Sequence, residues 1–164
     1  MANQTTGNQM RALKLGSLAL GLSFALGAGA QGIVASAQGG YQWMAPDGRF
    51  RTIEFTAVRD SNNNQRGQGH FYNHVTGLRL HFVIDCLSVQ GNMATISGKL
   101  SKSTNPELQD APFLLRVVDN GEGKNATADQ ASPIAIFVDA QAWVCTDPVT
   151  GPLYPAVGGN IQVR

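Results

Sequence analysis

The chain has few charged and few aromatic residues, and each shortage narrows what the protein can be. Charged side chains make up 14% of its 164 residues and nearly cancel, leaving a formal net charge of +1. Such a surface has no strong field to attract nucleic acid or an anionic membrane. Aromatic residues account for only 7%, whereas glycines number 19 and prolines 7. This abundance of turn-forming residues favours many short strands over long helices.

Familiar catalytic motifs are missing too. The sequence contains no G-x-S-x-G, no H-E-x-x-H and no phosphate-binding glycine loop. The acidic residues Glu54, Asp85 and Glu107 fall in unrelated segments, so the sequence does not indicate the carboxylate pair that glycosidases use. We therefore predict that the protein is not an enzyme and carries no cofactor, with a calcium ion at one acidic loop as the exception to consider.

The N-terminus has the pattern of a secretory signal peptide. Arg11 and Lys14 precede the apolar segment 15–30, which is followed by small residues. That segment is rich in Gly and Ala and shorter than the roughly 20 residues of a membrane-spanning helix. We expect a secreted protein, in the medium or at the cell surface, with no stable membrane span after signal removal. Met10 is an alternative start.

This pattern also predicts where the folded domain begins. The preferred cleavage site is Ala35-Ser36-Ala37, and Ala28-Gly29-Ala30 is the second choice. The prediction is a signal peptide over residues 1–37, an N-terminal lead-in over 38–47 and a single β domain over 48–164.

The chain has two cysteines, Cys86 and Cys145. In an exported protein such a pair predicts a disulfide, and no motif around either residue supports a catalytic thiol. The segment 78–86 alternates, which places Leu78, Leu80, Phe82 and Ile84 on one face and Arg79, His81, Val83 and Asp85 on the other. Cys86 lies two positions after Ile84, so the alternation places it on the same face and predicts that it points inward.

Other segments also alternate like half-buried strands. Ile53, Phe55 and Ala57 share a face, as do Ala94, Ile96, Gly98 and Leu100. Gly91-Asn92 separates two strands as a hairpin turn, and the final segment 158–164 is expected to pair back into the sheet. The resulting seven or eight strands predict an all-β fold, a single antiparallel β-sandwich or small β-barrel.

An acidic loop follows the predicted strand at 113–118. It carries Asp119, Glu122 and Asp129, which suggests a Ca²⁺ site. The spacing does not fit a helix-flanked calcium loop, because position 3 is Gly121 and position 6 is Lys124. Aspartates and glycines of this kind also occur in ordinary turns, so the sequence favours a structural turn over a metal site.

The three histidines are His70, His74 and His81. On a strand, positions 70 and 74 share a face, but their spacing matches no established zinc signature and exposed strand histidines are the simpler interpretation. Four aromatic residues form a candidate ligand platform or simply pack in the core: Trp43, Tyr72, Trp143 and Tyr154.

Three segments carry a resemblance to a known group. They are "CLSVQGNMATISGKL" (86–100), "FLLRVVDNGEGKNATADQ" (113–130) and the ending "GGNIQVR". Together they resemble a group of small secreted bacterial all-β domains of unassigned activity. The resemblance implies fold and location, and it makes the loop between Asp119 and Asp129 a recurrent feature of the group. It implies no catalytic residues.

These observations predict a secreted, non-catalytic β domain that acts as a binding or structural module outside the cell. Its partner is an extracellular ligand or protein of unknown identity. Two alternatives remain open. One is a small-ligand-binding barrel of the lipocalin or streptavidin kind, which needs an interior pocket lined by 78–84 and 113–117. The other is a secreted hydrolase, which needs a carboxylate beside His70 or His74.

Overall fold

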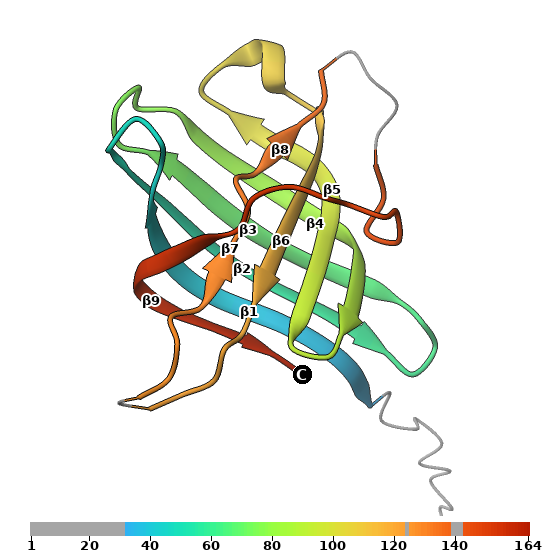
Figure 1. Cartoon of the computed structure of the whole chain (residues 1–164). Coiled ribbons are helices and arrows are strands. Elements are labelled where there is room, and N and C mark those ends of the chain that lie inside the picture. The colour runs from blue at the N-terminus through green and yellow to red at the C-terminus, as the bar shows by residue number, and fades with distance from the viewer. Residues whose placement is uncertain (1–31, 124, 139–142) are drawn as a thin grey trace, which may run out of the picture. The chain divides into compact units, whose positions relative to one another are not determined.

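Antiparallel strands make up most of the chain that the computed structural model describes, residues 32–123, 125–138 and 143–164 (Figure 1). A single 3₁₀ turn, η1 (Pro106–Leu108), interrupts them. The strands are β1 (Ile33–Met44), β2 (Phe50–Asp60), β3 (Gln65–Asn73), β4 (Arg79–Gln90), β5 (Met93–Ser103), β6 (Pro112–Val118), β7 (Gln130–Ala131), β8 (Ala135–Ile136) and β9 (Tyr154–Val163).

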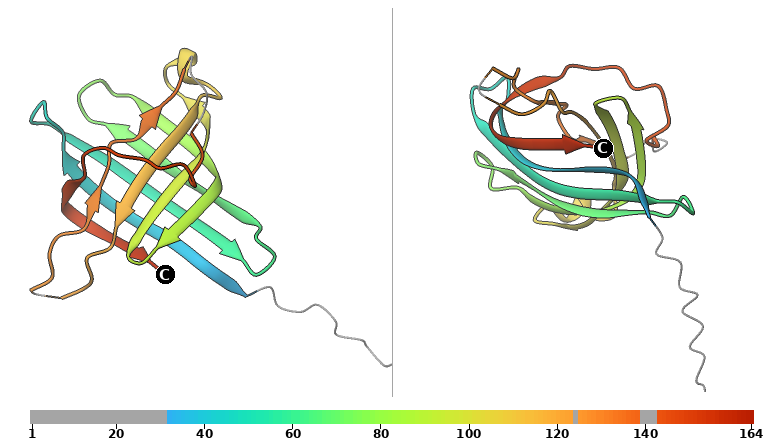
Figure 2. Two further views of the ribbon diagram at one scale, coloured as in Figure 1. Left: turned by 45° about the vertical axis from the view of Figure 1, so that its right-hand side comes forward. Right: turned by 90° about the horizontal axis from the view of Figure 1, so that it is seen from below.

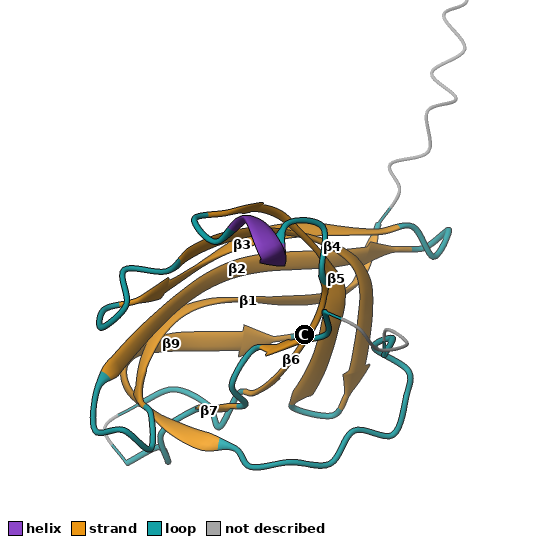
Figure 3. Ribbon diagram, turned by 90° about the horizontal axis from the view of Figure 1, so that it is seen from above, coloured by secondary structure: helices purple, strands orange, loops and turns teal. Residues whose placement is uncertain are grey.

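The strands form one sheet that closes on itself. Their order is β5-β4-β3-β2-β1-β9-β7-β6-β8, and β5 also pairs with β6. The predicted all-β fold is therefore confirmed, and of the two architectures left open the chain adopts the barrel (Figure 2). Viewed from above, the strands surround a common interior (Figure 3). The two-residue strand β7 is the only bridge between β6 and β9 among the described strands, so closure is weakest there.

The alternation read from the sequence describes the barrel wall well. Ile53, Phe55 and Ala57 point inward and are buried, while Glu54 and Thr56 between them are exposed. On β5 the inward residues 94, 96 and 100 are also buried, but here Thr95 and Ser97 between them are buried as well. Burying a side chain such as Phe or Ile contributes about 1.5–3 kcal/mol, so these inward rows supply most of the driving force for folding.

Two glycines have roles that a larger residue would not fill. Gly91 forms the β4–β5 hairpin turn with φ +60°, in the left-handed region that glycine adopts at little cost. Gly69 faces inward, where the ring of Phe82 occupies the space that a side chain would need. Phe82 in turn contacts Phe113 across the interior, with ring centroids 4.7 Å apart.

The N-terminal boundary differs from the sequence-based prediction. Residues 38–47, predicted as a lead-in, lie largely in β1, which begins at Ile33 and pairs with both β2 and β9. Its inward side chains Ala35, Ala37, Tyr41 and Trp43 are buried in the core. Ala35 and Ala37, which belong to the predicted cleavage motif, are therefore small residues of a buried strand face. The predicted leader up to residue 31, with Ala28-Gly29-Ala30, lies outside the described residues.

Within the described part of the chain, no helix has the length and apolar character needed to cross a membrane.

Candidate functional site

Asp129, in the predicted calcium loop, is a buried hydrogen-bond acceptor. It is 7% exposed, and its two carboxylate oxygens each bind one backbone N–H group. Oδ1 accepts from Asn120 at 2.8 Å, and Oδ2 accepts from Ile161 in β9 at 2.7 Å. Hydrogen bonds to a charged acceptor are roughly twice as strong as neutral ones, so this carboxylate holds the loop to β9.

Asp119 does the same at the other end of the loop. Its Oδ1 accepts from the N–H of Gly121 at 2.8 Å, and its Oδ2 accepts from that of Val163 at 3.0 Å. The N–H groups of Ile161 and Val163 lie on an edge of β9 that β7 pairs with at only two residues. The two carboxylates therefore satisfy donors that a longer neighbouring strand would otherwise satisfy.

Glu122 is exposed and binds side chains of β9. Its Oε1 accepts from the amides of Asn160 at 2.8 Å and Gln162 at 3.3 Å. Among the described residues, no three His, Cys, Asp or Glu side chains are grouped to hold a metal ion. This geometry favours the interpretation of the acidic loop as an organised turn, and calcium binding stays a prediction.

The segments that carry the sequence resemblance meet in one hydrogen-bond network. Asn92, in the hairpin turn, donates its side-chain amide to the carbonyl of Asp119 at 2.8 Å, and its own carbonyl accepts from the N–H of Asp119 at 2.9 Å. The Asp119–Asp129 loop then binds β9 through both of its aspartates. These motif residues therefore serve to close the barrel.

Cys86 and Cys145 form the predicted disulfide, with Cα atoms 5.6 Å apart. The prediction that Cys86 points inward is wrong. The pairing of β4 with β5 shifts register between Ile84 and Cys86, and this bulge reverses the alternation. Leu87 then points inward and is 1% exposed, whereas Cys86 lies on the outer face of the wall.

The described part of the segment between β8 and β9, residues 143–153, crosses the outer face of β5 and β6, and we call it the covering loop. Two attachments hold it there. One is the disulfide at Cys145. The other is Arg116 in β6, whose guanidinium donates to the carbonyls of Val149 at 2.9 Å and Gly151 at 2.6 Å. Figure 1 shows this loop in red-orange, crossing in front of both strands.

The histidines gather differently from the prediction. His70 and His81 face each other on β3 and β4, with ring centroids 4.2 Å apart. His74 lies beyond the end of β3, where it contacts the ring of Tyr72 and shares a hydrogen bond of 2.8 Å with the hydroxyl of Thr52. A strand ending at Asn73 explains why positions 70 and 74 do not form the expected pair.

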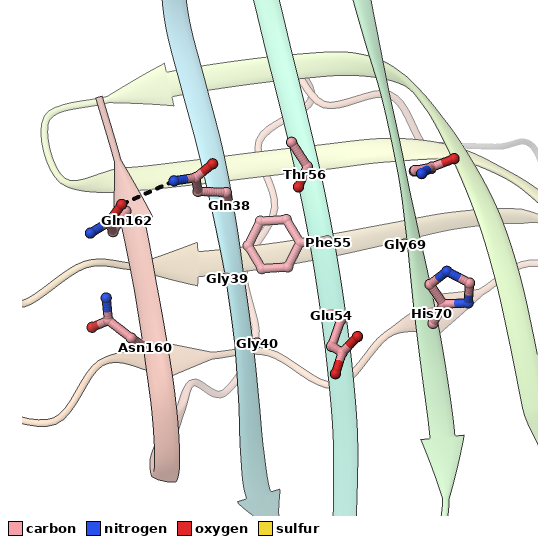
Figure 4. Close-up of a pocket in the computed structure, with 11 residues that line it drawn as sticks. Gln38, Gly39, Gly40, Glu54, Phe55, Thr56, Gly69, His70, Asn160 and Gln162 are labelled. Atoms are coloured by element: carbon pink, nitrogen blue, oxygen red, sulfur yellow. Dashed lines mark hydrogen bonds between the residues drawn. The ribbon is translucent and has the colours of Figure 1, made fainter.

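A polar hollow of about 530 Å³, which we call the trough, lies on the outer face of the barrel. The residues that line it come from β9, β1, β2 and β3, which lie side by side (Figure 4). Its floor contains Gly39, Gly40 and Gly69. Gly40 lies on the outer face, where its missing side chain leaves the surface open, whereas Gly69 faces the interior. The polar residues that line it are Gln38, Glu54, Thr56, Gln68, His70, Asn160 and Gln162.

Two of the amide side chains in the trough are joined by a hydrogen bond. Gln38 donates to Oε1 of Gln162 at 3.0 Å, and Gln162 donates to Glu122. A second hollow of about 310 Å³ continues the trough across β3 and β4 and shares Glu54 and His70 with it. There the guanidinium of Arg79 stacks on Tyr72 at 5.1 Å from the ring centroid.

The aromatic residues considered as a platform are not assembled into one. Trp43 is buried in the core, Tyr72 lies on the outer face, and Trp143, at the start of the covering loop, stacks on Phe137.

The barrel interior is occupied by side chains. The inward residues of 78–84 and 113–117 were those expected to line a ligand pocket. Leu80, Phe82, Ile84, Phe113, Leu115 and Val117 are each at most 1% exposed and belong to one core. Two polar atoms in this interior, the hydroxyl of Tyr41 and the indole N–H of Trp43, have no hydrogen-bond partner among the described residues.

No protein-family model, curated protein or solved structure matches this chain.

Sequence reasoning identified His70 as a site residue but missed most of the trough. Gln38, Gln68, Asn160 and Gln162 carry no motif and are ordinary surface amides when read singly. The alternation of each strand places them on an outer face, which was the available signal. Their convergence depends on β9 lying beside β1, a pairing between residues about 120 positions apart along the chain.

Proposed function

We propose that this protein is a secreted, non-catalytic binding module, and that its trough binds a neutral, hydroxyl-rich ligand such as an oligosaccharide. The observation that carries the proposal is the row of amide and hydroxyl side chains contributed by β9, β1, β2 and β3 around the glycine floor. The predicted signal peptide and the disulfide support a location outside the cell.

The chemistry of the trough suits sugar hydroxyl groups. A primary amide offers two donors and an acceptor, and a sugar hydroxyl likewise both donates and accepts. Gln38 and Gln162 already exchange such a bond, so their orientation is partly set before a ligand arrives. The net charge of +1 gives no long-range attraction for a polyanion, which favours a neutral ligand.

Binding is favoured over hydrolysis at this site. The fold does bring a carboxylate near His70, because Glu54 faces it in the β2–β3 register. Glu54 is the one carboxylate among the residues that line the trough, whereas glycoside hydrolysis uses two. The hydrolase alternative would require a second catalytic group from elsewhere.

The test is a titration of the oxidised protein with cellohexaose, xylohexaose and chitohexaose, followed by NMR of the backbone amides. We expect shifts confined to the trough strands, and weakening of about tenfold in a Gln38→Ala, Gln68→Ala double variant through the loss of several hydrogen bonds. Gln90→Ala, exposed at the far end of β4, is the matched control. Absence of binding to all three sugars, or equal affinity in the double variant, would contradict the proposal.

The small-ligand barrel remains a second candidate because of the unpartnered atoms of Tyr41 and Trp43. Burial raises the pKa of Tyr41 far above its usual range, so the hydroxyl keeps its proton and needs an acceptor. If a ligand or water satisfies it, Tyr41→Phe will lower the free energy of unfolding by about 1 kcal/mol. If the interior holds neither ligand nor water, as the filled core indicates, Tyr41→Phe will leave the free energy of unfolding unchanged or raise it. Denaturant unfolding measures the difference.

A further inference from the structure

The feature that the binding proposal does not use is the facing pair His70 and His81. They occupy directly opposite positions on β3 and β4, and both side chains are exposed on the outer face. Facing residues of an antiparallel pair have Cβ atoms about 4.5–5.5 Å apart. Their imidazole rings meet edge to face, with centroids 4.2 Å apart and planes at 73°.

Both rings have their nitrogens available. Neither His70 nor His81 makes a side-chain hydrogen bond to another described residue. His74, in contrast, is hydrogen-bonded to Thr52. The pKa of His81 is lowered by partial desolvation, and further by the charges of His70 and Lys102. An exposed imidazole nitrogen that bonds no other described residue is free to bind a metal ion.

We propose that His70 and His81 together bind one divalent transition-metal cation, with Cu²⁺ preferred over Ni²⁺ and Zn²⁺. Imidazole nitrogen is a ligand that all three ions accept. A given site of this kind binds Cu²⁺ more tightly than it binds Ni²⁺ or Zn²⁺. Two protein ligands are consistent with the absence of any larger His, Cys, Asp or Glu group in the described part of the chain. His70 lines both hollows and His81 lines the second, so the pair lies where the two hollows meet.

The groups around the pair set the balance of charge. Glu54 on β2 faces His70 and attracts a cation, whereas Lys102 on β5 faces His81 and repels it. Arg79, in the neighbouring row of the same face, adds a second positive charge. Removing one opposing charge should therefore strengthen binding, a result that a purely structural histidine pair would not produce.

The experiment uses untagged, EDTA-treated protein and titrates it with CuCl₂, NiCl₂, ZnCl₂ and MgCl₂ by calorimetry. We expect one ion per chain for the transition metals and none for Mg²⁺, which prefers oxygen ligands. His70→Ala and His81→Ala should each weaken copper binding at least about tenfold, and Lys102→Gln should tighten it. Electron paramagnetic resonance of the copper complex should show coupling to two imidazole nitrogens.

His74→Ala is the matched control, since it removes an exposed histidine from the same surface. Full copper affinity in the His70→Ala, His81→Ala double variant would place the metal elsewhere, for example at the terminal amine, and would overturn the proposal. Equal loss in His74→Ala would overturn it as well. Because the probes are metal salts, neither result depends on the oligosaccharide titration.

Discussion

The aspartates of the acidic loop show how a single residue can replace part of a strand. Asp119 and Asp129 point their carboxylates at the N–H groups of Val163 and Ile161, on an edge of β9 that β7 scarcely covers. An unsatisfied buried N–H costs about 1–3 kcal/mol. The two carboxylates prevent that loss at the weakest part of the barrel.

We predict that Asp129→Asn lowers the free energy of unfolding by about 2 kcal/mol or more, because one oxygen becomes an amide that faces a donor. Urea unfolding at neutral pH measures the change. Glu122→Gln is the control, with an effect within about 0.5 kcal/mol, because its carboxylate is exposed. The same reasoning predicts equal melting temperatures in Ca²⁺ and in EDTA. A rise of several degrees with Ca²⁺, abolished by Asp119→Ala, would instead establish an ion site.

At the scale of the element, β1 is the strand whose boundary matters most. It pairs with β2 on one side and β9 on the other, and its first residues bond to the end of the chain. The N–H and C=O of Ser36 both pair with Arg164, at 2.8 and 2.9 Å. Cleavage after Ala37 would therefore cut through a central strand.

We predict that the protein beginning at Gln31 is more stable than the form beginning at Gln38, by about 2–4 kcal/mol. The shorter form loses the backbone bonds of Ser36 and the burial of Ala35 and Ala37. Denaturant unfolding of the two forms measures the difference. If the chain is exported as proposed, mass spectrometry of the mature protein should find an N-terminus before Ile33. An N-terminus at Gln38 with undiminished stability would show this account of β1 to be wrong.

At the scale of the whole molecule, closure of the barrel wall and attachment of the covering loop depend on different interactions. Hydrogen bonding closes the wall through β7, while the disulfide joins the outside of β4 to the covering loop. In the chain-entropy model, a crosslink across 59 positions stabilises the fold by about 4 kcal/mol.

We predict that a Cys86→Ala, Cys145→Ala variant loses stability of that order but keeps its sheet at room temperature, because the core does not include the disulfide. Far-ultraviolet circular dichroism follows the sheet, and thermal melting follows the stability. Loss of the sheet signal in the unheated variant would mean that the crosslink also holds the wall together.

Much of the fold follows from local patterns. Alternation on β2, β4 and β5 identifies the inward rows, and Gly91-Asn92 marks the hairpin, because side-chain direction and turn conformation depend on near neighbours. The same local rule gave the wrong direction for Cys86. A bulge is set by pairing with the facing strand, and the sequence of one strand does not reveal it.

The sequence by itself determined the class of the protein, namely an all-β chain with one disulfide and an acidic turn, because these depend on composition, short-range pattern and cysteine chemistry. Only the tertiary structure decided the rest. It closed the sheet into a barrel, made β1 part of the wall, placed the aspartates against β9, and brought amides from both ends of the chain into one trough. Each of these depends on pairing between distant segments, whose energy is shared among many weak contacts and leaves no signature in any single stretch of sequence.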